Sequence, residues 1–218
     1  LLLLSDIVQN LHSNNLHNNM EGSGEEKEYN SKTYSFDDFK QIQADVFSKR
    51  ADHYLPILLK FSYKDRAAKE AAVILEQWDR RMTRESVGGL IFQVFLYKFA
   101  ELLLQDQLGE GFRIYTMFIT LFYSVLDTFF DNADRKRNLH SELLGEHSLE
   151  ELCEQTLKET IQFLENSLGR NRKKWYWGRL HRYYYRRTGT IGKIAEWFFN
   201  RGPYPAGRST GTINMANC

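Results

Sequence analysis

The chain has 218 residues, enough for one large domain or two small ones with a sizeable buried core. Hydrophobic residues make up 42% of it and charged residues 26%, which is typical of globular rather than disordered proteins. The formal net charge of +1 gives no strong overall attraction to nucleic acid or to acidic lipid surfaces.

The first segment, residues 1–33, is expected to lie outside the main fold. Leu1 to Leu4 are apolar, but no basic residues precede them and no small-residue cleavage site follows. We interpret them as the cut end of a helix rather than as a signal peptide. Residues 10–33 are rich in Asn, Ser, Gly and Glu, which is typical of an exposed linker or insertion loop.

Helical signals begin at Ser35. Ser35 and Asp38 have the spacing of a capping box, and apolar residues follow at helical spacing at Phe39, Ile42 and Val46. Pro56 is expected to mark either a break or the first turn of the next helix. Residues 66–82 are predicted to be helical, with an apolar face formed by Ala71, Ile74, Leu75 and Trp78.

The longest predicted helix runs from Ser86 to about Leu108 and ends at a C-cap glycine, Gly109. Its broad apolar face contains Ile91, Val94, Phe95, Phe99, Leu102 and Leu103. Trp78 is expected to be buried against Phe95 or Phe99 of this helix.

Another helix is predicted over roughly residues 112–131. It contains the charge-free run Ile114 to Leu126, which is shorter than the roughly 20 residues that a membrane span needs. We therefore interpret this run as a buried core helix.

Ser148 and Glu151 form a second capping-box pattern, which opens an amphipathic helix that ends at Gly169. Strand-like residues come only near the end, at 212–214. The sequence therefore predicts a mainly α region over residues 34–200. A Pro- and Gly-rich exit loop and the start of a strand follow over residues 201–218.

Chemical motifs are scarce. The six histidines and the two cysteines, Cys153 and Cys218, show no metal-ligand spacing, so no metal site is expected in this chain. No phosphate-binding glycine loop and no Gly-x-Ser-x-Gly motif is present. Asp45, on a predicted helix, and Asp79 are expected to be solvated or capping carboxylates. His181 is expected to be packed or hydrogen-bonded, since no second group at a fixed spacing would orient it as a base.

The stretch Arg170–Arg187 is the strongest candidate for an interaction site. Eight of its 18 residues are Lys or Arg, none is acidic, and Trp and Tyr residues are interleaved with them. Such a pattern suits RNA, because basic groups neutralise phosphates and aromatic rings stack on bases. The alternative is structural: the aromatic residues pack at the edge of a core, and the arginines either snorkel to solvent or pair with acids such as Glu150 and Glu151.

Four blocks of sequence carry a further pattern. Residues 34–59 contain an Asp before Gln-x-Asp, then Ser, Ala and Leu-Pro, at Asp38, Gln43, Asp45, Ser48, Ala51, Leu55 and Pro56. Residues 74–109 contain Trp-Asp, a basic turn with Ser, and the long apolar helix. Residues 175–187 contain Trp-Gly-x-x-His, and residues 200–214 contain Gly-Pro-Tyr-Pro-x-Gly and Thr-Ile-Asn. In this order the blocks resemble the penicillin acylase (penicillin amidase) family of N-terminal-nucleophile hydrolases. Arg208 and Gly211 depart from the family's pattern, which often has Gly and Asp there.

The resemblance implies a precursor that cleaves itself into two chains. The new N-terminal Ser of the β chain attacks an amide carbonyl, with its own α-amine as general base. The parent fold would be α+β, a four-layer αββα sandwich, and this chain a mainly α fragment, the helical insertion of the β chain. The nucleophile is expected upstream, so no catalytic residue is assigned here, and substrate-binding residues stay unknown. Ser35, Ser48, Ser86 and Ser148 are excluded as the nucleophile because none is an N-terminus.

The resemblance also implies the partners, which are the rest of the β chain, the α chain and a small N-acyl amide substrate. Acylated β-lactams, N-acyl homoserine lactones and other N-acyl amines are the candidate substrates. Nucleic-acid and membrane partners are not expected, and a periplasmic or secreted location is. No cofactor is expected in this chain, while calcium is compatible with the parent protein. The fragment alone is expected to be inactive. The open alternative is a helical interaction module that binds RNA through residues 170–187.

The exit loop is expected to leave the helical region as extended chain. Pro203 and Pro205 fix φ near −65°, and Gly202 and Gly207 permit turns that other residues resist. Residues 212–214 would then start a strand of the parent sheet.

Overall fold

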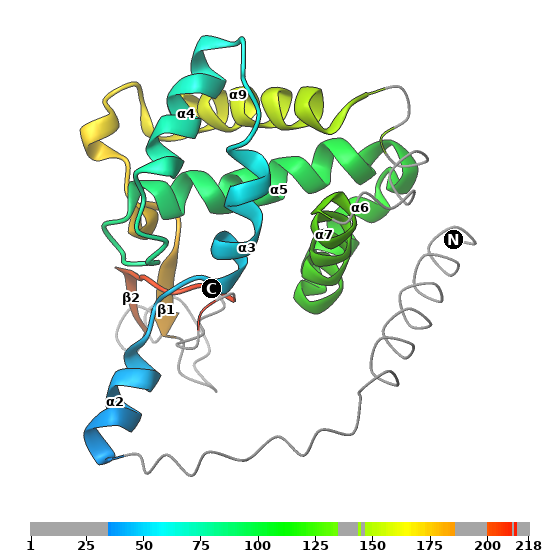
Figure 1. Cartoon of the computed structure of the whole chain (residues 1–218). Helices are drawn as coiled ribbons and strands as arrows, with labels where there is room; N and C mark the ends of the chain where they lie inside the picture. Colours follow the sequence, from blue (N-terminus) through cyan, green and yellow to red (C-terminus); the bar gives the residue numbers. More distant parts are fainter. Residues whose placement is uncertain (1–34, 135–143, 145–146, 186–199, 211, 213–218) are drawn as a thin grey trace, which may run out of the picture. The chain divides into compact units, whose positions relative to one another are not determined.

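The computed structural model describes residues 35–134, 144, 147–185, 200–210 and 212, which are mainly helical (Figure 1). The predicted fold class is confirmed for these residues. The chain divides into two units between Asp38 and Phe39. This division falls inside the first described helix, and the proposed segment boundaries at 33 and 200 stay predictions.

Helix α2, Phe36–Ala44, opens with the predicted capping box. The Ser35 N–H donates to Asp38 Oδ2 over 2.8 Å, and the Asp38 N–H donates to Ser35 Oγ over 3.2 Å. The expected continuation to Val46 is wrong. The Asp45 carboxylate lies beyond the helix and accepts the Phe47 N–H at 3.0 Å, which turns the chain out of the helical path.

Helix α3, Lys49–Leu58, begins at the N-cap Ser48, whose Oγ accepts the Ala51 N–H at 3.2 Å. Pro56 lies inside this helix, so its predicted role as a break or a first-turn residue is wrong. Pro removes a backbone donor, but here it stands close to the helix end. Burial of Tyr54, Leu55 and Leu58 holds that last turn against the core.

Helix α4, Arg66–Glu76, is capped by Asp65, which accepts the Ala67 N–H at 2.8 Å and the Ala68 N–H at 3.1 Å. It ends at Glu76, so the prediction that the helix reaches residue 82 is wrong. Trp78 consequently lies in the turn after the helix and not on its face.

Helix α5, Val87–Leu108, is the central helix. Ser86 Oγ accepts the Gly89 N–H at 2.9 Å, and Gly109, at φ 51°, ends the helix as expected. The helix is long and apolar enough to cross a membrane, yet 67% of its most apolar window is buried inside the molecule. A helix that is apolar on all sides and buried in this way is typical of a core.

Helices α6, Gly111–Met117, and α7, Ile119–Asp134, replace the single helix predicted over 112–131. The chain breaks at Phe118, where φ is −91° and ψ is 80°. The charge-free run is therefore only partly a core helix. Met117 and Phe118 are 76% and 61% exposed, whereas Phe122 and Leu126 are buried.

Helix α9, Leu149–Leu168, has both hydrogen bonds of the predicted capping box between Ser148 and Glu151, and it ends at Gly169. α4 and α9 pack against each other and against α5, while α6 and α7 pack together and also contact α5 (Figure 1). The largest fully buried side chains of this core include Trp175, Tyr54, Phe92, Phe95, Phe99 and Phe130.

After α9 come two 3-10 turns, η2 at Arg172–Lys174 and η3 at Trp177–Arg179, and then strand β1, Arg182–Tyr185. β1 pairs antiparallel with β2, Arg201–Pro205. The expected extended path of Pro203 and Pro205 is thus confirmed, whereas the pairing was not predicted. Gly202 has φ 115°, a conformation that favours glycine. The strand expected over 212–214 lies outside the described residues except for Thr212, which forms a bend.

Candidate functional site

Parts of all four sequence blocks meet at one place, which we call the junction, formed by residues 46–48, 80–86, 177–181 and 206–209. The Met82 N–H donates to the Val46 carbonyl over 2.8 Å, and the Arg208 N–H donates to the Met82 carbonyl over 2.6 Å. The Gly178 N–H donates to the Arg84 carbonyl over 2.7 Å. The loop before α5 is therefore held by backbone hydrogen bonds from segments before and after it.

Two glycines make this close approach possible. A Cβ at Gly178 would lie 2.8 Å from Cβ of Pro205, and a Cβ at Gly207 would lie 2.8 Å from the Met82 carbonyl oxygen. Real Cβ atoms do not approach other atoms so closely, so these positions admit only glycine without a backbone shift. This lack of space for a side chain explains why positions 178 and 207 carry Gly.

Trp177 and His181 attach the last segment to the junction. Their rings stack with centroids 4.6 Å apart and an interplanar angle of 9°. The Trp177 Nε1–H donates to the Arg208 carbonyl over 2.8 Å, and His181 Nδ1 lies 3.3 Å from the Ala206 carbonyl oxygen. His181 is buried, packed and hydrogen-bonded, as the sequence predicted.

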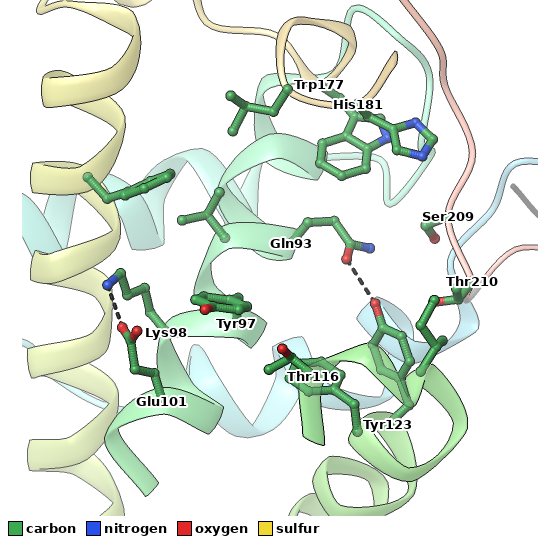
Figure 2. Close-up of a pocket in the computed structure, with 15 residues that line it drawn as sticks. Gln93, Tyr97, Lys98, Glu101, Thr116, Tyr123, Trp177, His181, Ser209 and Thr210 are labelled. Carbon is green, nitrogen blue, oxygen red and sulfur yellow. Dashed lines mark hydrogen bonds and ion pairs between the residues drawn. The ribbon is translucent and has the colours of Figure 1, made fainter. Parts of the chain in front are cut away.

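A groove of about 670 Å³ lies beside the junction (Figure 2). α5 forms its floor, and α9, the α6–α7 pair, η3 with the residues after it, and residues 209–210 form its sides (Figure 2). Its walls include Gln93, Tyr97, Lys98, Glu101, Ile119, Tyr123, Phe163, Trp177, Leu180 and His181.

Polar and apolar side chains both line the groove. At one end the Tyr123 hydroxyl donates to Gln93 Oε1 over 3.2 Å (Figure 2). At its other end Lys98 Nζ lies 2.5 Å from Glu101 Oε2 and also 5.8 Å from the centroid of the Phe163 ring. These groups are thus partnered within the chain. The arrangement can bind apolar groups but offers no strong unpaired charge to a ligand.

A second polar cluster joins α3 to α7. Arg50 makes two hydrogen bonds to the Asp127 carboxylate, at 2.9 and 3.0 Å, and its guanidinium lies 4.0 Å from the centroid of the Tyr123 ring. The Tyr54 hydroxyl donates to the same carboxylate. Burial and then the negative charge of Asp127 raise the pKa of Tyr54, so the phenol stays protonated and acts as a donor. Burial alone would lower the pKa of Arg50, but Asp127 more than offsets this and raises it.

The four serines excluded as nucleophiles have another role. Ser35, Ser48, Ser86 and Ser148 stand directly before helices, and each hydroxyl accepts a backbone N–H of the first turn. An N-cap hydroxyl satisfies a helix donor that otherwise has no partner. Each position therefore has a structural reason to carry Ser.

The two carboxylates that the sequence singled out also act locally. Asp79 accepts the Arg81 N–H at 2.9 Å, and Asp45 Oδ1 lies 3.4 Å from Arg81 Nη2. Among the described residues, no group of three or more His, Cys, Asp or Glu side chains could hold a metal ion. Cys153 is free and buried, and burial raises the pKa of its thiol, which keeps the thiol protonated.

The basic stretch 170–187 is partly built into the core. Trp175 is fully buried and its Nε1–H donates to the Gly169 carbonyl over 2.8 Å, which confirms the expected packing at a core edge. The expected acidic partners are wrong, however. Arg172 pairs with Glu70 and lies 3.6 Å from Glu165, because η2 follows the end of α9 and not its beginning.

Trp78 is half-buried, and its expected contact with Phe95 or Phe99 is wrong. Its ring packs against Phe92, with centroids 5.7 Å apart, and its Nε1–H donates to the Arg81 carbonyl over 3.1 Å. The early end of α4 places Trp78 beside the first turns of α5, where Phe92 lies. The sequence offers no signal for this shift.

The chain is similar in sequence to a known protein family and to two named proteins. Residues 16–218 match the model of a family described as penicillin amidase. The acyl-homoserine lactone acylase QuiP of Pseudomonas aeruginosa is 25% identical over 167 residues, which cover 68% of this chain and 20% of that protein. The acyl-homoserine lactone acylase QuiP of Pseudomonas fluorescens is 29% identical over 154 residues, which cover 68% of this chain and 18% of that protein. The chain thus spans about a fifth of the length of these relatives.

Proposed function

Since this chain belongs to the penicillin amidase family, we propose that it is the helical segment of an amidohydrolase that cleaves linear amides into an acid and an amine. The observation that carries the proposal is the junction. Parts of all four blocks that resemble the family, quoted from distant parts of the sequence, meet there through backbone hydrogen bonds. The family pattern thus corresponds to one packed structure in this chain.

In the proposed reaction the nucleophile is an N-terminal Ser outside the described residues. Its α-amine takes the hydroxyl proton while the oxygen attacks the amide carbonyl, and the amine leaves with a proton. Water then attacks the acyl-enzyme ester, which releases the acid and restores the Ser hydroxyl. Oxyanion donors would also come from outside the described residues.

The contribution of this chain to that enzyme is positional. The stacked Trp177 and His181 and the loop before α5 fix the path of residues 206–209. We infer that this path directs the following chain toward the sheet of the parent fold. Residues of the junction would then affect activity through folding and alignment, without contacting the substrate.

For the substrate we propose N-acyl amines, with N-acyl homoserine lactones first, because both relatives carry that name. Acylated β-lactams have the same kind of linear amide and are the second choice. The test expresses the full reading frame that encodes this chain and analyses the product by intact mass and N-terminal sequencing. We expect two chains, the second beginning with Ser, and we expect Ser→Ala at that position to prevent both cleavage and hydrolysis. An uncleaved product that nevertheless hydrolyses the amides would contradict the proposed mechanism.

Binding of RNA through residues 170–187 remains the alternative. Two of its aromatic residues have structural roles, because Trp175 is buried and one face of Trp177 is covered by His181. Arg172 is held by two glutamates. The stretch therefore offers fewer stacking and phosphate-binding groups than its sequence suggests, which favours the hydrolase proposal.

A further inference from the structure

The groove beside the junction exposes large apolar side chains on several of its sides. Tyr97 on α5, Ile119 on α7, Phe163 on α9 and Leu180 after η3 all line it, and each is at least 38% exposed. Met117 and Phe118, at the break between α6 and α7, add exposed apolar surface on the neighbouring helices. The four residues that line the groove come from four separate segments of the chain, so the exposure is a property of the assembled surface.

Such a surface differs from scattered exposed hydrophobic residues, which are normal on proteins. A contiguous apolar patch around a concavity marks a site where something else packs. Two pairs of polar side chains in the groove are partnered within the chain, Gln93 with Tyr123 and Lys98 with Glu101 (Figure 2). The groove therefore lacks an unpaired charge that would select a charged peptide, and it favours aliphatic or aromatic side chains.

We propose that the groove is the docking surface for apolar side chains from the part of the same amidohydrolase that lies outside these 218 residues. This inference rests on the proposed function, and its support is the length of the relatives. Since the chain spans about a fifth of them, the corresponding protein would contain several times more polypeptide than this chain. The part of that polypeptide in the same processed chain would be tethered to these residues, so it would reach the groove at a far higher effective concentration than a separate partner.

The groove is also large enough for such a contact. About 670 Å³ accommodates several side chains of leucine or phenylalanine size. Burying each large apolar side chain contributes about 1.5–3 kcal/mol. Residues of the groove would then help to hold the helical segment in place while remaining remote from the chemistry.

The test measures protection of a cysteine placed in the groove. Phe163→Cys puts a thiol at a site that is 40% exposed in this chain, and Val73→Cys, on α4 and away from the groove, puts one at a site that is 49% exposed. Both are made in a background in which Cys218, and in the full-length protein every cysteine outside these 218 residues, is replaced by Ser; Cys153 is buried. Tyr97→Cys serves as a second groove variant in case Phe163→Cys fails to fold.

In the 218-residue chain we expect the groove and control thiols to react with a maleimide probe at similar rates. In the full-length protein the groove thiol should react at least about tenfold more slowly than the control thiol. A tenfold difference corresponds to about 1.4 kcal/mol of protection. Equal rates in the full-length protein would overturn the proposal. Protection that depends on protein concentration would indicate a second copy instead, and protection that appears only with N-decanoyl homoserine lactone would indicate a ligand site; either result overturns it. A protected groove in a protein without amidase activity would support the docking surface and refute the proposed function.

Discussion

Gly88→Ala tests the contact between the α4–α5 turn and the first turn of α5. A Cβ at Gly88 would lie 2.3 Å from Cγ, 2.5 Å from Cβ and 2.8 Å from Cδ2 of Trp78. These atoms are near the root of the side chain, so the indole cannot rotate away without moving the backbone of the turn. Overpacking of this kind typically costs about 1–3 kcal/mol. Replacing Gly by Ala inside a helix stabilises the folded chain by at most about 1 kcal/mol.

After the gain in helix propensity is subtracted from the cost of overpacking, we expect Gly88→Ala to lower the free energy of unfolding by about 1–2 kcal/mol, because three atoms clash. For a chain of this size that corresponds to a melting temperature lower by about 2–8 °C, measured by circular dichroism. The matched control is Gly111→Ala at the start of α6, where an added Cβ would meet nothing within 4 Å. This control should leave the melting temperature unchanged or raise it slightly.

A double mutant decides whether Trp78 is the cause. In a Trp78→Gly background all three of these Trp78 atoms are absent, so Gly88→Ala should no longer destabilise the chain. If Gly88→Ala costs the same with and without Trp78, or behaves like Gly111→Ala in the parent, the described packing of this turn is wrong.

Three other predictions concern the core, acid stability and RNA. Trp175→Ala should lower the free energy of unfolding, measured in urea, by about 3–5 kcal/mol because the indole is fully buried. Lys173→Ala, at an exposed position, should have little effect. Equal urea midpoints for the two variants would show that Trp175 is not part of the core. Hydrogen bonds from the Ser148 backbone and hydroxyl lower the pKa of Glu151 below its ordinary 4.5, so its stabilising contribution is present above that pH and is lost as the pH falls through the lowered value. The Glu151→Gln variant should accordingly lose less free energy of unfolding than the parent as the pH falls below 5. Identical dependence of stability on pH in the two proteins would argue against the capping box. Binding of the chain to a mixed single-stranded RNA should be weaker than micromolar at two salt concentrations, and a tight affinity that falls steeply with salt would favour the RNA-binding alternative.

Helix starts could be predicted because their determinants are local. Ser35 with Asp38 and Ser148 with Glu151 place a cap and its reciprocal acceptor three residues apart, and both capping boxes are present. Gly109 and Gly169 likewise end their helices through positive φ angles. The expectation that His181 is packed or hydrogen-bonded is also confirmed.

Other features depend on contacts that no local pattern shows. Arg50 and Asp127 are 77 positions apart, and their pairing fixes α3 against α7. The break at Phe118 has neither Gly nor Pro at its centre, and the chain there continues an apolar run. The β1–β2 pair is largely exposed on both strands, so it lacks the alternation of buried and exposed residues by which strands are recognised.

The junction has features that the sequence shows and features that only the structure shows. The residues Trp177, Gly178, His181 and Gly207 could be picked out from the sequence, since they belong to the blocks that resemble the family. Their physical role could not be, because it depends on backbone approaches between segments that are far apart in the chain. The structure accounts for them as packing residues.

The most direct test of the central claim is the release of free homoserine lactone and decanoate from N-decanoyl homoserine lactone. The full-length protein and the 218-residue chain are assayed side by side at equal concentration. We predict turnover by the processed full-length protein and none above buffer by the chain alone. The account would be contradicted by a correctly cleaved full-length protein that hydrolyses neither this amide nor a phenylacetyl anilide, or by activity of the chain alone that persists through purification.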